Sequence, residues 1–310
     1  MSASYTVRTL VSTPGRGVRH RRVRLRVQSL EDRRTPTGAV WQGYAMNAQH
    51  TATSAVASQP LSAIRWQASV DLQPQYSGTA LLIHYGSPAV TAANTVIVPV
   101  KTGATGGFRV NAFDGSTGQP RWSRTTAYQL PPIPGWTPSY GPVLTPAGRY
   151  YFPGNGGTVN YIDEPDGTGA VSGQFAFFGL ANYAADPTAY NGTVFINTPL
   201  TSDAAGNVYF GFRVTGANPL GLTSGLARVA PDGTSTWTPA TTLLGNTVAT
   251  DRVVYNCAPA VSNDGQTLYI AANSGASNFS SAGALVAVDS TTLAVRNRVG
   301  LVDPSSGNPA

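Results

Sequence analysis

The sequence predicts an all-β fold assembled from repeated four-stranded antiparallel sheets. Charged residues make up only 11% of the chain, which holds 34 glycines and 23 prolines but a single lysine. This composition suits many short strands joined by turns rather than helices. Two patterns define the repeat. Within residues 108–122, apolar and polar residues alternate before a turn that is rich in Asp, Gly, Ser and Thr, and a second short strand follows it. A hairpin that begins with proline recurs along the chain.

Residues 1–38 form a basic amino-terminal segment that we expect to be disordered. Nine arginines in residues 1–36 oppose only Glu31 and Asp32, so this segment carries a net charge of about +7 and the rest of the chain about −1. No apolar run reaches the length of a signal-peptide core or a membrane helix, so we expect no standard signal peptide and no transmembrane segment. Because no aromatic residues alternate with the arginines, we expect no nucleic-acid partner.

Four segments of the remaining chain repeat one hairpin. Each has a proline, an apolar residue followed by Thr or Ser, a small turn, and a second strand. The prolines lie 54, 57 and 60 residues apart, at Pro88, Pro142, Pro199 and Pro259. The spacing predicts one sheet per repeat, with repeats at about 64–123, 139–171, 197–239 and 255–299.

A third strand follows each hairpin, and a fourth strand follows most of them. We expect the third strands at residues 108–114, 158–163, 225–230 and 284–289. Fourth strands are predicted around Trp122, Trp237 and Val295. Four antiparallel strands per unit, repeated radially, describe the blades of a β-propeller. The Gly-rich loops between second and third strands, at residues 101–107, 215–224 and 273–283, should then gather on one face.

The first repeat resembles the PQQ-like (quinoprotein) β-propellers. Its residues Ala112, Asp114, Thr117, Gly118 and Trp122 match every fixed position of their blade motif, AxDxxTGxxxW. The fourth repeat keeps Asp289 and the first half of the motif. In the third repeat, Trp237 follows an acidic turn at a shorter spacing than the motif has. Residues 41–51 look like the opening segment of such propellers, and residues 64–67 like an outer strand that enters the ring. The resemblance spans roughly residues 40–303, and we assign residues 39–310 to the propeller.

The number of repeats predicts an incomplete ring. About four to five blades are recognisable, whereas six to eight are usual in the family that the sequence resembles. The chain is then a fragment of a longer propeller, or its ring is open, or another chain completes it. Self-association, or blades supplied by another segment, would follow from this count because an open ring leaves sheet edges uncovered.

The resemblance implies alcohol dehydrogenation by PQQ with calcium, but the sequence lacks the residues for it. Those enzymes hold PQQ against adjacent cysteines and bind calcium through Glu, Asn and Asp. This chain has one cysteine, Cys257, and Glu164 is its only glutamate outside the basic segment. Two histidines, His50 and His84, lie in the body, too few for a histidine metal site. We therefore expect no PQQ, no calcium and no other cofactor, and we assign no catalytic, cofactor-binding or metal-binding residue.

Five residues are candidates for channel or partner contacts. His84 and Tyr85 lie at the start of a blade, where strand entrances approach the central channel, and the others are Tyr140, Phe177 and Phe178. The two phenylalanines belong to an aromatic stretch, residues 175–183, that we interpret as an insertion between blades. It would pack in the core, cover a sheet edge, or form a partner surface.

These observations favour a non-enzymatic binding or scaffold module with a protein or glycan partner. The alternatives are a degenerate quinoprotein-like oxidoreductase or carbohydrate-active enzyme with a channel site, and a structural cell-surface component. Residues 30–36, LEDRRTP, resemble the LEDRxxP segment near the amino terminus of many large planctomycete proteins thought to be exported or surface proteins. That resemblance implies a bacterial protein that is exported or located in the cell envelope, with residues 1–38 as its tail or targeting segment.

Overall fold

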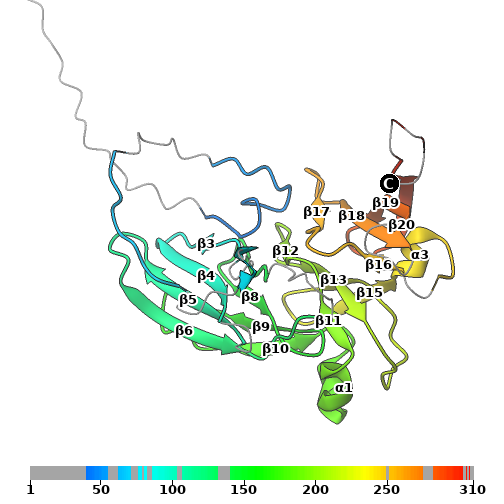
Figure 1. Ribbon diagram of the computed structural model, residues 1–310, viewed down its shortest axis with the longest axis horizontal. Coiled ribbons are helices and arrows are strands. Elements are labelled where there is room, and N and C mark those ends of the chain that lie inside the picture. Colours follow the sequence, from blue (N-terminus) through cyan, green and yellow to red (C-terminus); the bar gives the residue numbers. More distant parts are fainter. Residues whose placement is uncertain are drawn as a thin grey trace, which may run out of the picture. The chain divides into compact units, whose positions relative to one another are not determined.

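The computed structural model contains four larger antiparallel sheets and one two-stranded hairpin formed by β1 (Tyr76–Ser77) and β2 (Ala80–Leu81) (Figure 1). It describes residues 40–54, 62–70, 76–78, 80, 81, 86–102, 107–131, 140–248, 251–274, 282–302, 305 and 307. The basic segment, residues 1–38, lies outside this range, as do His84 and Tyr85. Within the described part of the chain, no helix is long and apolar enough to span a membrane.

The first large sheet, blade 1, contains the complete turn motif. Its strands are β3 (Ala89–Val90), β4 (Thr95–Lys101), β5 (Phe108–Asp114) and β6 (Pro120–Thr126), in that order. The Asp114 carboxylate closes the turn between β5 and β6 by accepting hydrogen bonds from the N–H groups of Ser116 and Thr117, at 2.9 and 3.0 Å. It also accepts from the Thr117 hydroxyl, at 3.1 Å, and from Arg121, at 2.7 Å. Asp and Thr three residues apart are therefore what this turn requires.

Blades 2 and 3 repeat the same strand order. Blade 2 contains β7 (Val143–Leu144), β8 (Tyr150–Pro153), β9 (Thr158–Ile162) and β10 (Gly173–Ala176). In blade 3, the innermost position is shared by β11 (Val194–Ile196) and β12 (Thr201–Ser202), followed by β13 (Val208–Val214), β14 (Gly225–Val229) and β15 (Ser235–Pro239). Strand β10 extends blade 2 beyond residue 171, so the first residues of the aromatic stretch form a fourth strand rather than an insertion.

Blade 4 repeats the turn of blade 1. Its strands are β16 (Arg252–Val253), β17 (Ala260–Val261), β18 (Thr267–Ser274), β19 (Ala282–Asp289) and β20 (Val295–Gly300). Asp289 accepts from the N–H groups of Thr291 and Thr292 at 2.9 and 2.8 Å, and from Arg296 at 2.7 Å. The arginine follows the aspartate by seven residues, as Arg121 follows Asp114.

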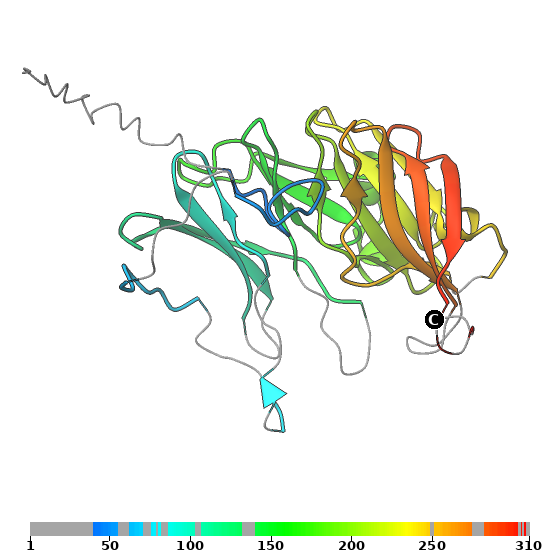
Figure 2. The same cartoon turned by 90° about the horizontal axis from the view of Figure 1, so that it is seen from above.

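These sheets are the blades of a β-propeller, the fold class that the sequence predicts. One cluster of buried apolar side chains joins blades 1, 2 and 3, and a second joins blades 3 and 4. In Figure 2 the blades follow one another in chain order, from β3–β6 in cyan to β17–β20 in orange and red. All four predicted third strands are present, as β5, β9, β14 and β19.

An aromatic side chain of one outer strand covers a turn glycine of the following blade at two junctions. Trp122 in β6 lies over Gly169 of blade 2, and its indole N–H donates to the Pro165 carbonyl at 2.8 Å. Phe175 in β10 lies against Gly233 of blade 3. Both glycines have positive φ, 64° and 88°, and a Cβ at either would come within 3.0 Å of the aromatic ring. Glycine is therefore required by both the turn and the packing.

Trp237, which the sequence assigns to the blade motif, lies on the opposite face of its sheet. It follows Asp232 by five residues, whereas Trp122 follows Asp114 by eight. Because side chains alternate between the faces of a strand, removing three residues reverses the face. The Trp237 ring accordingly meets Phe177, 6.4 Å away between ring centroids, on the side of the preceding blade.

The junction between blades 3 and 4 uses aliphatic side chains. Leu293 occupies the turn position that Gly118 has in blade 1; it has a φ of 60° and is buried. Leu243, from the short helix α3 (Ala240–Leu244) that follows β15, is fully buried in the same cluster. Burial of these two side chains offsets the cost of a leucine in the left-handed region.

Candidate interaction surfaces

The opening segment, residues 41–50, crosses the innermost strands of all four blades. A hydrogen bond ties it to each of them: Trp41 to Val90 in blade 1, Gln42 to Leu144 in blade 2, His50 to Thr201 in blade 3 and Ala48 to Val261 in blade 4. The distances range from 2.7 Å for the bond between Leu144 and Gln42 to 3.3 Å for the bond between His50 and Thr201. The chain's own residues therefore cover the inner strands on this side, in keeping with the resemblance to a propeller's opening segment.

A small pocket lies beside the opening segment and has room for about one water molecule. His50 is the titratable side chain of interest in it. Burial lowers the pKa of His50, so its imidazole is neutral at pH 7, and the ring packs edge-on against Tyr44 with centroids 5.2 Å apart. Among the described residues, no carboxylate lines the pocket.

Three of the predicted contact residues are buried. Tyr140 packs against Phe108 and Tyr128, with ring centroids 4.8 and 5.2 Å apart, and burial raises the pKa of its phenol well above the usual value. Phe177 and Phe178 both belong to the core that joins blades 1 to 3. These three side chains contact the chain itself, so we carry none of them forward as a partner contact. His84 and Tyr85 lie outside the described residues.

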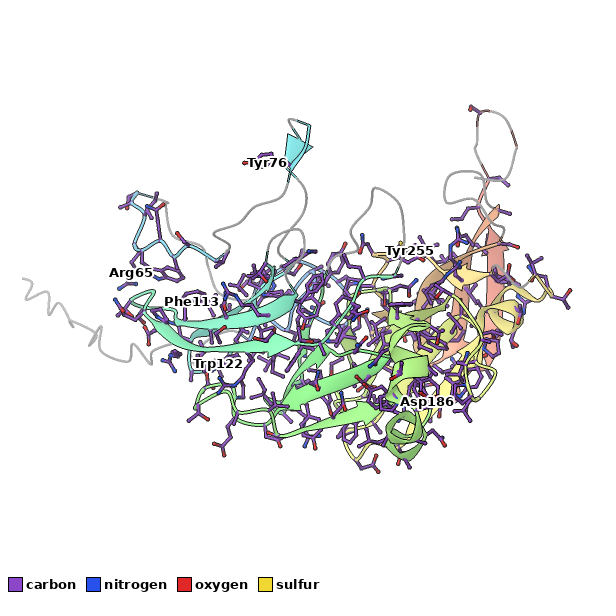
Figure 3. The ribbon with its side chains drawn as sticks, turned by 60° about the horizontal axis from the view of Figure 1, so that its bottom comes forward. Arg65, Tyr76, Phe113, Trp122, Asp186 and Tyr255 are labelled. Carbon is purple, nitrogen blue, oxygen red and sulfur yellow. The ribbon has the colours of Figure 1, made fainter. Side chains whose placement is uncertain are left out.

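An exposed arm of two short helices connects blades 2 and 3. Helix α1 (Leu180–Ala185) is followed directly by Asp186 and α2 (Pro187–Asn191). The Asp186 carboxylate, marked in Figure 3, accepts a hydrogen bond from the Ala189 N–H at 3.0 Å and so caps α2. Most side chains of the arm are exposed, and Asp186 is its single charged residue. The arm is thus a nearly uncharged projection.

Hydrogen bonds hold the arm in a defined conformation. The Tyr183 hydroxyl donates to the Asn191 side chain at 3.0 Å, which joins the two helices. The Asn182 side chain donates to the Phe178 carbonyl at 2.7 Å, which ties the arm to the buried end of blade 2. A partner of this arm would meet a preformed surface, which reduces the entropy lost on binding.

The loop at residues 215–224 lies next to the arm. The Thr215 N–H donates to the carbonyl of Thr193, two residues after the end of α2, at 2.9 Å. Inside the loop, Asn218 exchanges two hydrogen bonds with Leu222, and Leu220 is exposed. Connections between second and third strands and connections between blades lie at the same strand ends, because the strands of a blade alternate in direction. We call residues 180–191 and 215–224 the loop-end surface.

The described residues do not fit the quinone and calcium that the resemblance implies. Among them, no group of three or more His, Cys, Asp or Glu side chains lies close enough to hold a metal ion. Cys257 is the chain's only cysteine, and burial raises the pKa of its thiol. The Trp122 ring packs at the junction between blades 1 and 2, over Gly169. We therefore derive no chemistry through PQQ or calcium, and the absence of a cofactor remains a prediction.

Similarity to known proteins concerns the fold. No protein-family model matches the chain, and no curated protein matches it. Among solved structures, it is similar to BamB from Moraxella catarrhalis, at 14% identity and a TM-score of 0.37, over 73% of this chain and 69% of that one. A europium-containing methanol dehydrogenase matches at 13% identity and a TM-score of 0.45, over 72% and 42% of the two chains. A quinohemoprotein alcohol dehydrogenase from Comamonas testosteroni matches at 13% identity and a TM-score of 0.41, over 68% and 34%.

These matches extend no activity to this chain. It spans less than half the length of the two dehydrogenases, and similarity at 13–14% identity concerns the fold alone.

The helical arm is a feature that the sequence analysis did not predict. One signal was available, because Asp followed directly by Pro is a helix start in which Asp caps the first turn and Pro occupies the first helical position. Asp186 and Pro187 have these roles in α2. The aromatic residues just before the arm favoured an interpretation of the whole stretch as one insertion, which concealed this signal.

Proposed function

We propose that this chain is a non-enzymatic binding or scaffold module that recognises a protein or glycan partner through its loop-end surface. The observation that carries the proposal is the arm at residues 180–191, a well-bonded helical projection whose side chains are mostly exposed. Exposed loops and insertions on a rigid scaffold are the usual location of recognition in folds of this kind.

The chemistry of the surface favours an uncharged partner region. Across residues 180–191 and 215–224 Asp186 is the single charged residue, and the exposed side chains are mainly Ala, Asn, Thr and Pro with Leu180 and Leu220. Such a surface binds through apolar contact and neutral hydrogen bonds, which suits a protein or glycan better than a polyanion. The folded body, with a net charge near −1, gives no attraction for nucleic acid.

We place this module in an exported or cell-envelope protein. The support is the LEDRRTP segment, residues 30–36, and its resemblance to segments of proteins thought to be exported. A largely uncharged Thr-, Ser- and Gly-rich body is compatible with that location.

Binding to envelope material tests the proposal. Purified full-length protein is mixed with the washed envelope fraction of the cells that make it, and the bound fraction is measured by sedimentation across a concentration series. We expect saturable binding that falls at least about 10-fold in affinity in a Leu180→Asp, Leu220→Asp double variant, because a charge at each position disfavours apolar contact.

Val171→Asp is the matched control, because Val171 is an exposed aliphatic residue in the connection between β9 and β10, at the other ends of the strands. We expect it to bind like the unmodified protein. Binding that the double variant leaves unchanged, or no saturable binding at all, would contradict the proposal.

A further inference from the structure

We propose that the opening segment is a pH-sensitive closure, which stays on the inner strands at neutral pH and dissociates from them in mild acid, when His50 gains a proton. This inference goes beyond the binding function, because it concerns the opening segment and not the loop-end surface.

The tie between the opening segment and blade 3 differs from the other ties. Backbone hydrogen bonds of 2.7–2.9 Å join the segment to blades 1, 2 and 4. On blade 3, by contrast, the Nε2 atom of the His50 imidazole lies 3.3 Å from the Thr201 hydroxyl in β12. This tie is longer than the others and is made by a side chain that can gain a proton near neutral pH.

The backbone of the opening segment is strained. Ala45, Met46 and His50 have positive φ values of 48°, 79° and 53°, and Ala52, just beyond the segment, has 53°. Elsewhere in the described part of the chain, non-glycine residues with positive φ occur singly, at Asn94, Asn256 and Leu293. A left-handed conformation is unfavourable for residues that carry a Cβ atom. The hydrogen bonds to the blades therefore hold the segment in a conformation that it would otherwise leave.

The surroundings of His50 suit a neutral imidazole and not a charged one. The ring packs edge-on against Tyr44, and β7 and residues 200–202 line the same pocket without any ionisable side chain. Tyr44 is the other titratable residue among the described residues that line it. An imidazolium in this pocket would lose hydration without gaining a counter-charge.

The carboxylates on the neighbouring strands are engaged in their own turns. Asp203 lies two residues beyond Thr201, and its carboxylate accepts hydrogen bonds from Ala205, Asn207 and Tyr209. On blade 4, Gln49 of the segment donates to the Ser262 carbonyl. The Ser262 hydroxyl donates to the exposed Asp264 and lowers the pKa of that carboxyl, so Asp264 stays charged in mild acid. Titration in this region therefore belongs to His50.

The direction of the pH effect follows from burial. Burial lowers the pKa of His50 below its ordinary value of 6.5, and an imidazole released into water regains that value. The closure is thus fully stabilised above pH 6.5 and weakens as the pH falls from 6.5 toward the lowered pKa of the bound segment. Because one proton is involved, the opening equilibrium changes by at most 10-fold per pH unit.

Dissociation of the segment would uncover backbone groups of the inner strands. Val90 exchanges two hydrogen bonds with Trp41, and the N–H groups of Leu144 and Val261 donate to carbonyls of the segment. These groups lie in or beside β3, β7 and β17. The state of His50 therefore decides whether the inner strands are accessible on this side.

Hydrogen exchange of the full-length protein tests the inference. Protection of peptides from residues 41–50 is measured at pH 7.5 and 5.5, corrected for the chemical exchange rate at each pH, with β5 as the internal reference. We expect protection to fall at least about threefold relative to β5 at the lower pH. His50→Gln is the matched variant, because glutamine can still pair with the Thr201 hydroxyl but gains no proton, and its protection should be independent of pH.

A second variant separates the tie from the titration. Thr201→Val removes the partner of His50 and leaves the imidazole in place, so protection should be lower at both pH values and should still fall in acid. An NMR titration, with the His50 signal assigned by its loss in His50→Gln, should give a pKa below 6.5. Circular dichroism establishes that each variant is folded at both pH values. Constant protection in the unmodified protein, an equal fall in His50→Gln, or a His50 pKa of 6.5 or higher would overturn the inference.

Discussion

Replacement of Trp122 by alanine tests the blade junctions most sharply. Trp122 is only 8% exposed, covers Gly169 of the next blade and donates to the Pro165 carbonyl. Truncation of a buried tryptophan costs about 3–5 kcal/mol of unfolding free energy, and about 1 kcal/mol of this belongs to the hydrogen bond. We therefore expect a loss of about 4 kcal/mol, a large part of the 5–15 kcal/mol typical of a folded domain.

Trp237→Ala is the matched control for this prediction. Trp237 is 36% exposed, and no hydrogen bond of its indole N–H is found among the described residues. Its ring is partly exposed and contacts Phe177 only edge-on, so its removal loses less buried apolar surface than removal of Trp122, and we expect a cost of about 1–2 kcal/mol. Trp122→Phe separates the two contributions, because it keeps most of the apolar contact and loses the hydrogen bond.

Urea unfolding followed by circular dichroism measures these differences without relying on tryptophan fluorescence. Midpoints and slopes are compared for the unmodified protein and the three variants. Equal losses for Trp122→Ala and Trp237→Ala would refute the reasoning, because the junction would then contribute no more than half-buried packing does.

Three further predictions follow from the same geometry. Gly169→Ala should lower the free energy of unfolding by about 3 kcal/mol, since the backbone has a φ of 64° and the added Cβ meets the Trp122 ring. Gly148→Ala, at a φ of 90° but with open space around the added Cβ, should lower it by about 1 kcal/mol, and thermal unfolding compares the two variants. Arg121, together with the backbone N–H groups of the turn, lowers the pKa of Asp114 to about 2. The stability that this carboxylate contributes is therefore present above its unfolded pKa of about 4 and is lost as the pH falls toward 2. The difference in melting temperature between the unmodified protein and Asp114→Asn should shrink over that pH range, and an unchanged difference would contradict the assignment. The purified protein should show no quinone absorbance and no stoichiometric calcium, and either finding would restore the dehydrogenase alternative.

The strands could be predicted because their signals are local. An aspartate and a threonine three residues apart satisfy the turn through their own hydrogen bonds, which is why Asp289 forms the same turn as Asp114 although its repeat lacks Gly and Trp. The third strands follow from period-two alternation next to such turns. These features depend on a few neighbouring residues and not on residues that are distant in the sequence.

The faces of the blades could not be predicted in the same way. The side of the sheet on which Trp237 lies depends on the length of its turn, and the burial of Phe177 depends on blade 3, which follows it in the chain. The exposure of Leu285 was also hidden, because β19 is apolar at alternate and intervening positions and is typical of a strand covered on both sides. Tertiary packing decides these features, and only the structure reveals them.

Site-specific photocrosslinking tests the central claim, that this propeller binds a partner through its loop-end surface. A photoreactive residue replaces Ala184 in α1 or, as the matched control, Ala147 in the turn between β7 and β8, at the other strand ends; both alanines are exposed. Irradiation of cells that make each variant, followed by mass spectrometry, should give one reproducible protein or glycan adduct at position 184 and none at position 147. The same adducts at both positions, or none at position 184, would contradict the account.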